Sequence, residues 1–344
     1  MASTADQQLF LGPVPLASGV VLPVTVAFAR YGQLAPDGRN AILVTHGYTA
    51  SHFMLAHGEG VAEGSWAPLI GPGKPLDTDR YFIVCANMLG SSYGTTGPAS
   101  LDPATGQPYG PDFPDITLSD IVDVQRRLLT HLGVRHLKAI VGPSYGGFQA
   151  LQWAVDHPDW VSNIGVVVSA PFLADGEHLN LPKLLASLRA DPNWNGGRYH
   201  DHHDRGGVTD TLRQLRAETL QSYGMDEVLA ARGLAPAERA TRIAAMADTW
   251  AHEFDANAMV TLLKAALKFD VRPALGRITA DVLYVIASSD KLFPPNPQDL
   301  AALQTTRGQR PLHYVEMQTP FGHQASGPAH ALWSGALQTL LDGR

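Results

Sequence analysis

Two serines of the chain lie between glycines in the pattern G-x-S-x-G, which is typical of a serine nucleophile held on a sharp turn. They are Ser92, in GSSYG (90–94), and Ser144, in GPSYG (142–146). A serine in such a turn can attack an acyl carbon if a base takes its proton and the backbone stabilises the oxyanion. The sequence must therefore show which serine has a strand before it and a helix after it.

The sequence around Ser144 supplies both elements. The apolar run LKAIVG (137–142) predicts a strand before it, and FQALQWAVDHP (148–158) predicts a helix after it. The glycines two residues before and after Ser144 leave room across the turn, where larger side chains would collide. Ser92 is followed instead by a stretch rich in proline and glycine, which cannot form a helix. We therefore predict that Ser144 is the nucleophile and that Ser92 lies in a loop.

A serine nucleophile needs a histidine to take its proton and a carboxylate to orient that histidine. After a strand–turn–helix nucleophile these residues follow in the order serine, acid, histidine. Asp290 comes shortly after the apolar run DVLYVIA (281–287), and His323 lies between the last predicted strand and the final predicted helix. We predict a triad of Ser144, Asp290 and His323. Four alternatives are less well placed: Asp270, Asp281, His313 and His330.

The oxyanion of an acyl-transfer reaction needs two preorganised backbone N–H donors. One is expected from Tyr145, the residue after the nucleophile. The second is expected from the loop after the early apolar run AILVT, where Tyr48 is the first choice and Thr49 the alternative. Gly47 lets this loop turn toward the site, and we interpret His46 as a hydrogen-bonding brace for the loop.

Short apolar runs alternate with helical patterns along much of the chain. Such runs suit a parallel sheet that is covered on both faces, so we predict an α/β fold with a mostly parallel central sheet flanked by helices. The predicted strands are 41–45, 81–87, 137–142, 164–170, 281–287 and 312–317. The predicted helices that surround them include 118–133, 148–158 and 328–342.

Residues 171–272 break this alternation, because they are rich in helix formers and contain no convincing strand. One helix is expected at 256–269, where apolar residues fall on one side. We interpret the stretch as a helical cap, inserted between two strands of a core made of residues 1–170 and 273–344. An insert of this size on an α/β core usually covers a site.

The composition limits the possible partners. The 344 residues carry a net charge of −7, which argues against nucleic acid because phosphate binding needs clustered lysine and arginine. No apolar run approaches the roughly 18 residues of a membrane helix, and the start of the chain lacks a signal-peptide pattern, so we expect a cytoplasmic protein. Cys85 is alone, and HDHHD (200–204) suits a loop better than a metal site. We predict no metal and no cofactor.

Five stretches of the sequence resemble the homoserine O-acetyltransferase-like branch of the α/β-hydrolase superfamily. They are HGYTASH (46–52), the long stretch 87–120, GPSYGGFQALQWAVDHPDWV (142–161), FDANAMVTLLKAALKFD (254–270) and SSDKLFPP (288–295). The resemblance implies the α/β-hydrolase fold and the same triad. It also implies a helical cap after the strand that follows the nucleophile helix, and a homodimer formed through that cap.

The chain departs from the acetyltransferases near the expected acceptor. They carry aspartate directly after the catalytic histidine, where it helps to hold the amino group of homoserine, and this chain has Gln324. They carry methionine after the nucleophile, where this chain has Tyr145. Their substrate-binding arginine has no clear match, so Arg213, with Arg216 as the alternative, is the candidate. The substrate-binding candidates are therefore Gln324, Gly47 and Arg213.

These residues predict an enzyme that forms an acyl-enzyme on serine. The first reading is a carboxylic ester hydrolase, favoured because Gln324 carries no charge to pair with an ammonium group. The alternative is an O-acyltransferase, with acyl-CoA as a co-substrate and an alcohol as acceptor. A binding module that keeps the fold without catalysis is a third hypothesis, opposed by the complete triad. The expected partner is a small ester or acyl donor.

Overall fold

An eight-stranded, mostly parallel sheet forms the centre of the computed structural model, which describes residues 4–56, 65–173, 180–200, 207–305 and 312–343. The strand order is β1-β2-β4-β3-β5-β6-β7-β8. Six neighbouring strands run parallel. They are β3 (Ala41–Thr45), β4 (Phe82–Ala86), β5 (Leu137–Pro143), β6 (Asn163–Val167), β7 (Asp281–Ala287) and β8 (Leu312–Met317). All six predicted strands are therefore present.

The sequence analysis missed a hairpin at the start of the chain. β1 (Thr4–Pro15) and β2 (Val21–Tyr31) pair antiparallel, and β2 pairs antiparallel with β4. Residues of β2 alternate between exposed and buried at its start, as expected for a strand with one face on the core. The search for continuous apolar runs did not detect this alternation.

Both faces of the parallel strands β3 to β7 are buried, whereas the edge strand β8 is partly exposed. In β3, Leu43 packs in the apolar cluster on one face, whereas Ile42 and Val44 pack in the cluster on the other. Successive side chains of a strand point to opposite faces, so the continuous apolar run reflects two covered faces. The helices of the core are α1 (Leu118–His131), α2 (Tyr145–Asp156), α8 (Pro297–Thr305) and α9 (Ser334–Asp342).

Helix boundaries differ from the predicted ones in two places. α2 begins at Tyr145, directly after the nucleophile, rather than at 148. The predicted terminal helix is broken into a short 3₁₀ helix and α9, with Trp333 between them. The short 3₁₀ helices are η1 (His52–Leu55), η2 (Ala67–Leu69), η3 (Gly110–Asp112), η4 (Pro158–Trp160), η5 (Asn195–Gly197), η7 (Arg272–Arg277), η8 (Gly322–Ser326) and η9 (His330–Leu332).

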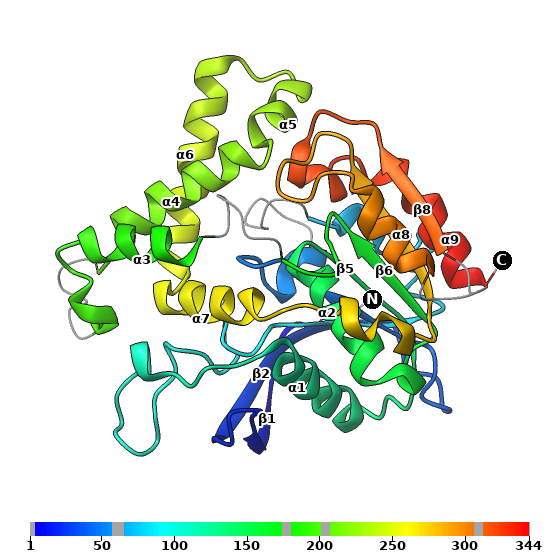
Figure 1. Cartoon of the computed structure of the whole chain (residues 1–344), viewed down its shortest axis with the longest axis horizontal. Helices are drawn as coiled ribbons and strands as arrows, with labels where there is room; N and C mark the ends of the chain where they lie inside the picture. Colours follow the sequence, from blue (N-terminus) through cyan, green and yellow to red (C-terminus); the bar gives the residue numbers. More distant parts are fainter. Residues whose placement is uncertain (1–3, 57–64, 174–179, 201–206, 306–311, 344) are drawn as a thin grey trace.

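In the part of the chain that the structure describes, five helices lie between β6 and β7. Figure 1 shows the first four to one side of the sheet, with α7 running from them to the core. Their bounds are α3 (Leu181–Ala190), α4 (Thr209–Ser222), α5 (Met225–Ala231), α6 (Pro236–Glu253) and α7 (Ala256–Leu267). They contain two apolar clusters of their own.

The two ends of this helical stretch meet beside the core. The N–H of Val271 donates to the carbonyl of Pro171 at 3.0 Å, and Phe172 forms an isolated antiparallel bridge with Asp270. An insert that leaves and re-enters a core at one point makes such contacts. The division into a core and a cap at 171–272 stays a prediction. No helix among the residues placed by the structure is long and apolar enough to cross a membrane.

Candidate active site

Ser144 lies on a sharp turn between β5 and α2. Its φ of 55° and ψ of −121° are unfavourable for a residue with a side chain, as expected for a nucleophile elbow. The turn is tight against β3: a Cβ on Gly142 would lie 2.1 Å from the Thr45 hydroxyl oxygen, and one on Gly146 would lie 2.3 Å from the Thr45 carbonyl oxygen. Glycine is therefore required on both sides of Ser144.

The structure brings the three predicted triad residues together from distant parts of the chain. His323 Nε2 lies 2.8 Å from Ser144 Oγ, and His323 Nδ1 lies 2.8 Å from Asp290 Oδ2. Asp290 is 2% exposed and His323 8% exposed. This arrangement allows His323 to accept the serine proton while Asp290 holds the imidazole in the required tautomer.

The carboxylate of Asp290 is held in its ionised form. Burial by itself raises its pKa, but the charge of His323 and hydrogen bonds from His323 and from the N–H groups of Phe293 and Leu292 outweigh burial and lower the pKa. Asp290 is therefore negative when His323 becomes positive during proton transfer.

The turn after α4, which the sequence analysis did not single out, also contacts His323 and the residue after it. The Tyr223 ring packs edge-on against the His323 ring, with 4.7 Å between centroids. The Gln324 N–H donates to the Tyr223 carbonyl at 3.0 Å. Gly224 and Gly322 allow this close approach, because a Cβ on Gly224 would lie 2.5 Å from the Phe321 carbonyl oxygen. In the sequence, the only sign of this contact was Gly224, the glycine of SYGMD (222–226), which indicates a turn.

The loop after β3 passes beside Ser144, as predicted. A Cβ on Gly47 would lie 3.9 Å from Ser144 Cβ. The backbone N–H groups of Tyr48 and Tyr145 donate to no acceptor among the described residues, so both are available to an oxyanion. Their oxyanion role, and that of the alternative Thr49, stays a prediction.

His46 braces this loop. Its Nε2 accepts from the Met88 N–H at 3.1 Å, and its Nδ1 lies 2.9 Å from the Gly47 carbonyl oxygen, to which it donates. Complete burial lowers the pKa of His46 to about 4. The ring is therefore neutral near pH 7 and can accept at one nitrogen and donate at the other.

Tyr48 and Tyr145, the two predicted oxyanion residues, contact α7 through their side chains. The Tyr48 hydroxyl donates to the Met259 carbonyl, and the Tyr145 hydroxyl donates to the Leu262 carbonyl at 3.1 Å. Their rings stack with 6.0 Å between centroids. Burial raises the pKa of both phenols, so both remain protonated donors. The loop after β3 and the start of α2 are therefore both joined to α7.

The substrate-binding candidates occupy different places. Gln324 is buried beside His323, and its side-chain amide forms no hydrogen bond within the part of the chain that the structure describes. Arg213 pairs with Asp210 and Asp248 and is not brought to the triad. Arg216, the alternative, is buried instead.

Arg216 reaches the loop that carries Tyr48. Its guanidinium donates to the Thr49 hydroxyl at 2.7 Å and lies 4.8 Å from the centroid of the Trp250 ring. Arg216 is 2% exposed. A buried guanidinium next to the oxyanion loop is suited to a carboxylate of a substrate.

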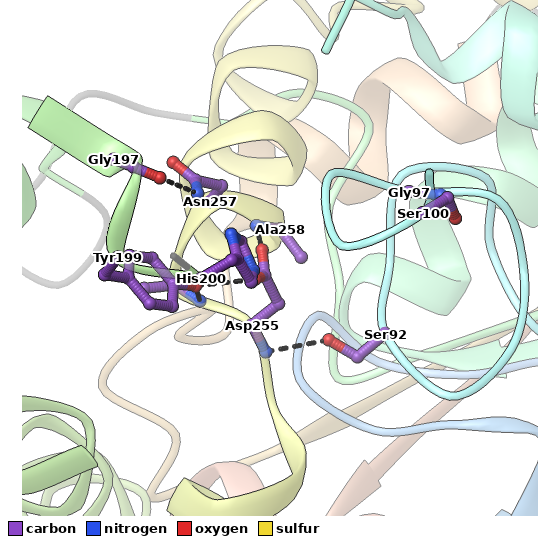
Figure 2. A network of polar contacts seen from close by, with 10 residues as sticks. Ser92, Gly97, Ser100, Gly197, Tyr199, His200, Asp255, Asn257 and Ala258 are labelled. Atoms are coloured by element: carbon purple, nitrogen blue, oxygen red, sulfur yellow. Dashed lines mark hydrogen bonds and ion pairs between the residues drawn. The ribbon is translucent and has the colours of Figure 1, made fainter. Parts of the chain in front are cut away.

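Ser92, the other serine between glycines, has no histidine bonded to its hydroxyl among the described residues. It lies in a loop, as predicted, and its hydroxyl accepts from the Asp255 N–H at 2.9 Å (Figure 2). The Asp255 carboxylate accepts from the Tyr199 hydroxyl and lies 2.6 Å from His200 Nε2. Ser92 therefore joins the core to the start of α7.

The candidate metal run HDHHD falls largely on residues 201–206, which lie outside the described residues. Its first residue, His200, contacts the Asp255 carboxylate, as Figure 2 shows. Among the residues that the structure does describe, no group of three or more histidine, cysteine or acidic side chains could hold a metal ion.

Comparisons with known proteins agree with this geometry. A family model described as the alpha/beta hydrolase fold matches residues 40–317. A homoserine O-succinyltransferase of Methylibium petroleiphilum is 36% identical over 340 residues, which cover 91% of this chain and 87% of that protein. A homoserine O-acetyltransferase of Solidesulfovibrio magneticus is 35% identical over 361 residues, which cover 96% and 89%.

Solved structures include both transferases and hydrolases. A homoserine O-acetyltransferase from Bacillus anthracis has a TM-score of 0.85 and 25% identity, covering 99% of this chain and 98% of that chain. An acetylester hydrolase from Corynebacterium glutamicum has a TM-score of 0.80 and 25% identity, covering 98% and 96%. The chain belongs to the homoserine O-acetyltransferase-like branch of the α/β-hydrolase superfamily.

Proposed function

We propose that the protein is an O-acyltransferase that moves an acyl group from acyl-CoA to the hydroxyl of a small acceptor. The observation that carries this proposal is the triad of Ser144, Asp290 and His323 in a chain about 35% identical, over nearly its whole length, to homoserine O-acyltransferases. These comparisons support the transferase better than the ester hydrolase that the sequence analysis placed first.

The proposed reaction has two halves. Ser144 Oγ attacks the thioester carbon while His323 takes its proton, and the N–H groups of Tyr48 and Tyr145 stabilise the oxyanion. The proton passes to the CoA sulfur as the thiol leaves. The acceptor hydroxyl then gives its proton to His323 and attacks the acyl-enzyme, which releases the new ester and restores Ser144. No metal or bound cofactor is needed, because CoA enters and leaves as part of the substrate.

The acceptor is proposed to carry a carboxylate. Arg216 supports this class, because a buried guanidinium beside the oxyanion loop gains most from a bidentate anionic partner. Homoserine, named in the relatives, has such a carboxylate. Its ammonium group would meet the uncharged amide of Gln324 rather than an acid, so we expect weak discrimination between homoserine and the same molecule without its amino group.

The second candidate function is ester hydrolysis. It is favoured by the neutral Gln324 beside His323 and by the likeness to the acetylester hydrolase of Corynebacterium glutamicum. In this case water replaces the alcohol in the second half of the reaction. The two functions share the acyl-enzyme and differ in what deacylates it.

The deciding experiment measures CoA release from acetyl-CoA and from succinyl-CoA by the purified enzyme. The acceptor is L-homoserine, 4-hydroxybutyrate or none, and Ser144→Ala is the control. We expect CoA release to depend on an added acceptor, with 4-hydroxybutyrate used at a rate within about tenfold of homoserine. Acceptor-independent turnover together with fast hydrolysis of p-nitrophenyl acetate would instead establish the esterase.

Gln324→Asp tests the acceptor site. A carboxylate at this position would pair with the ammonium group, so the ratio of kcat/KM for homoserine to that for 4-hydroxybutyrate is expected to rise by about tenfold or more. An unchanged ratio would show that residue 324 does not contact the amino group. Gln318→Asp, on an exposed segment, is the matched control.

A further inference from the structure

Gln149 is a fully buried polar side chain on α2, five positions beyond the nucleophile. Its amide nitrogen lies 3.1 Å from the His46 carbonyl oxygen and 3.4 Å from the Tyr145 carbonyl oxygen. It also lies 3.0 Å from Met88 Sδ. One side chain therefore binds the loop after β3 and the first residue of α2.

The direction of this amide is fixed by a chain of buried groups. Trp153 Nε1 can only donate, and it donates to Gln125 Oε1 at 2.8 Å. Gln125 must then present its NH₂ group, which donates to Gln149 Oε1 at 2.6 Å. Gln149 in turn must present its own NH₂ group to the two backbone carbonyls. The indole N–H of Trp153 therefore fixes which end of each glutamine amide, in Gln125 and in Gln149, acts as donor.

The two carbonyls belong to peptides beside the expected oxyanion donors. The His46 carbonyl lies two residues before the Tyr48 N–H, and the Tyr145 carbonyl belongs to the residue that supplies the second N–H. The Thr45 hydroxyl at the end of β3 also donates to the Gly146 carbonyl at 2.8 Å, and the rings of Tyr48 and Tyr145 stack on one another. Gln149 differs from these contacts because its amide bonds to a carbonyl beside each donor.

We propose that Gln149 is a positioning residue that holds the two oxyanion donors at their working separation, with Gln125 and Trp153 fixing its orientation. The inference rests on the proposed acyl-enzyme chemistry at Ser144 but not on the identity of the acceptor. Preorganised donors stabilise an oxyanion only when their spacing matches it, and small displacements reduce the rate steeply. Gln149 touches neither substrate nor the reacting atoms.

The test uses Gln149→Met and Gln149→Glu in the full-length enzyme. Methionine keeps the length but cannot donate, and a glutamate carboxylate would face two carbonyl oxygens. We expect kcat for p-nitrophenyl acetate to fall about 10- to 100-fold, with KM within about twofold of wild type. This loss is smaller than the roughly 10²- to 10³-fold fall in kcat that follows removal of a whole oxyanion donor, because both donors remain but are displaced. The rate of labelling by a serine-reactive phosphonate should fall in parallel.

Two further variants separate positioning from folding. Gln152→Met removes a side-chain amide from the same helix. The Gln152 amide bonds to Ser119 and Asp156, away from the oxyanion donors, so kcat of this variant should stay within about twofold of wild type. Trp153→Phe keeps an aromatic ring but removes the donor that sets the polarity, so it should lower kcat about 3- to 10-fold. It also keeps the experiment decisive if the Gln149 variants do not fold.

The outcomes distinguish this inference from the proposed function. A wild-type enzyme that resists the phosphonate would contradict the acyl-enzyme at Ser144. The positioning role would be overturned if the phosphonate labels the wild type but the Gln149 variants have the same kcat as Gln152→Met and only a lower melting temperature. If the Gln149 variants do not fold, the same comparison is made with Trp153→Phe. An unchanged pH profile of kcat/KM in the variants is also expected, because the His323–Asp290 pair is left intact.

Discussion

The two serines between glycines show how the surrounding backbone decides the chemistry of one hydroxyl. Ser144 has a positive φ and points its hydroxyl at His323, whereas the hydroxyl of Ser92 accepts from the Asp255 N–H. The two five-residue segments, GSSYG and GPSYG, differ at a single position. What differs physically is the helix that follows Ser144, because its first turn places the residue on the elbow.

Ser144→Ala is expected to lower kcat at least about 10⁴-fold, because the acyl-enzyme cannot form. Ser92→Ala is the matched control. It leaves a buried N–H without its acceptor, which costs about 1–3 kcal/mol of stability, but its kcat should stay within about threefold of wild type. Steady-state kinetics with p-nitrophenyl acetate check both. Loss of turnover in Ser92→Ala alone would reverse the assignment.

His46 gives the fold a pH dependence. Its pKa of about 4 in the folded protein is below the ordinary value of 6.5, so the unfolded chain binds more protons between these values. Stability contributed by neutral His46 is therefore full above about pH 6.5 and is lost as the pH falls toward 4, by roughly 3 kcal/mol in all.

His46→Gln should weaken that dependence, since glutamine does not titrate. Urea unfolding at pH 7 and pH 5 checks this, with the difference in unfolding free energy expected to shrink by about 1–2 kcal/mol relative to wild type. His131→Gln, at an exposed histidine at the end of α1, is the control for the method. The prediction would be contradicted if the unfolding free energy changed equally between pH 7 and pH 5 in His46→Gln and in wild type.

At the scale of elements, the turn after α4 packs against the loop that carries His323. Gly224 and Gly322 face one another, with φ values of 96° and 55°. Tyr223 covers the His323 ring, and its carbonyl accepts from the Gln324 N–H. A helix pair from the predicted cap therefore sets the position of a group that belongs to the core.

Gly224→Ala tests this contact against Gly233→Ala. Both glycines have positive φ, so each substitution should lower the unfolding free energy by about 1–2 kcal/mol for the backbone conformation alone. Only a Cβ at 224 would collide with the Phe321 carbonyl, whereas a Cβ at 233 meets nothing within 4 Å. We therefore expect kcat to fall about tenfold or more in Gly224→Ala alone. Equal activity in the two variants would show that the contact does not position His323.

At the scale of the whole molecule, the sheet core and the helices between β6 and β7 are joined through buried polar groups as well as apolar packing. Asp255 caps α7 by accepting from the Ala258 N–H at 2.8 Å, and it receives the Tyr199 hydroxyl (Figure 2). Its own N–H donates to Ser92 in the core. Removing the carboxylate would uncap a helix and leave buried donors without acceptors.

Asp255→Ala is expected to lower the unfolding free energy by about 2–4 kcal/mol. Asp248→Ala, which removes a partly exposed ion-pair partner of Arg213, should cost less than about 1 kcal/mol. Urea unfolding followed by tryptophan fluorescence, with Trp194 and Trp250 as reporters in the helical insert, measures both. Similar losses in the two variants would contradict a structural role for the Asp255 network.

Much of the site was predictable because its signals are local. The strand, glycines and helix around Ser144 are contiguous, and Asp290 and His323 follow recognisable strands. The β1–β2 hairpin was missed because its burial alternates. Between Arg213 and Arg216, three residues apart on one helix, local sequence could not decide which faces the site.

The sequence by itself determined the nucleophile elbow and the positions of the six parallel strands along the chain, since backbone conformation and periodic burial follow from neighbouring residues. Only the tertiary structure decided which groups meet across the chain. The Tyr223 ring on His323, the Arg216 guanidinium on Thr49 and the Gln149 amide on His46 are contacts of this kind. Each joins residues more than 90 positions apart, and such contacts depend on how whole elements pack rather than on any local pattern.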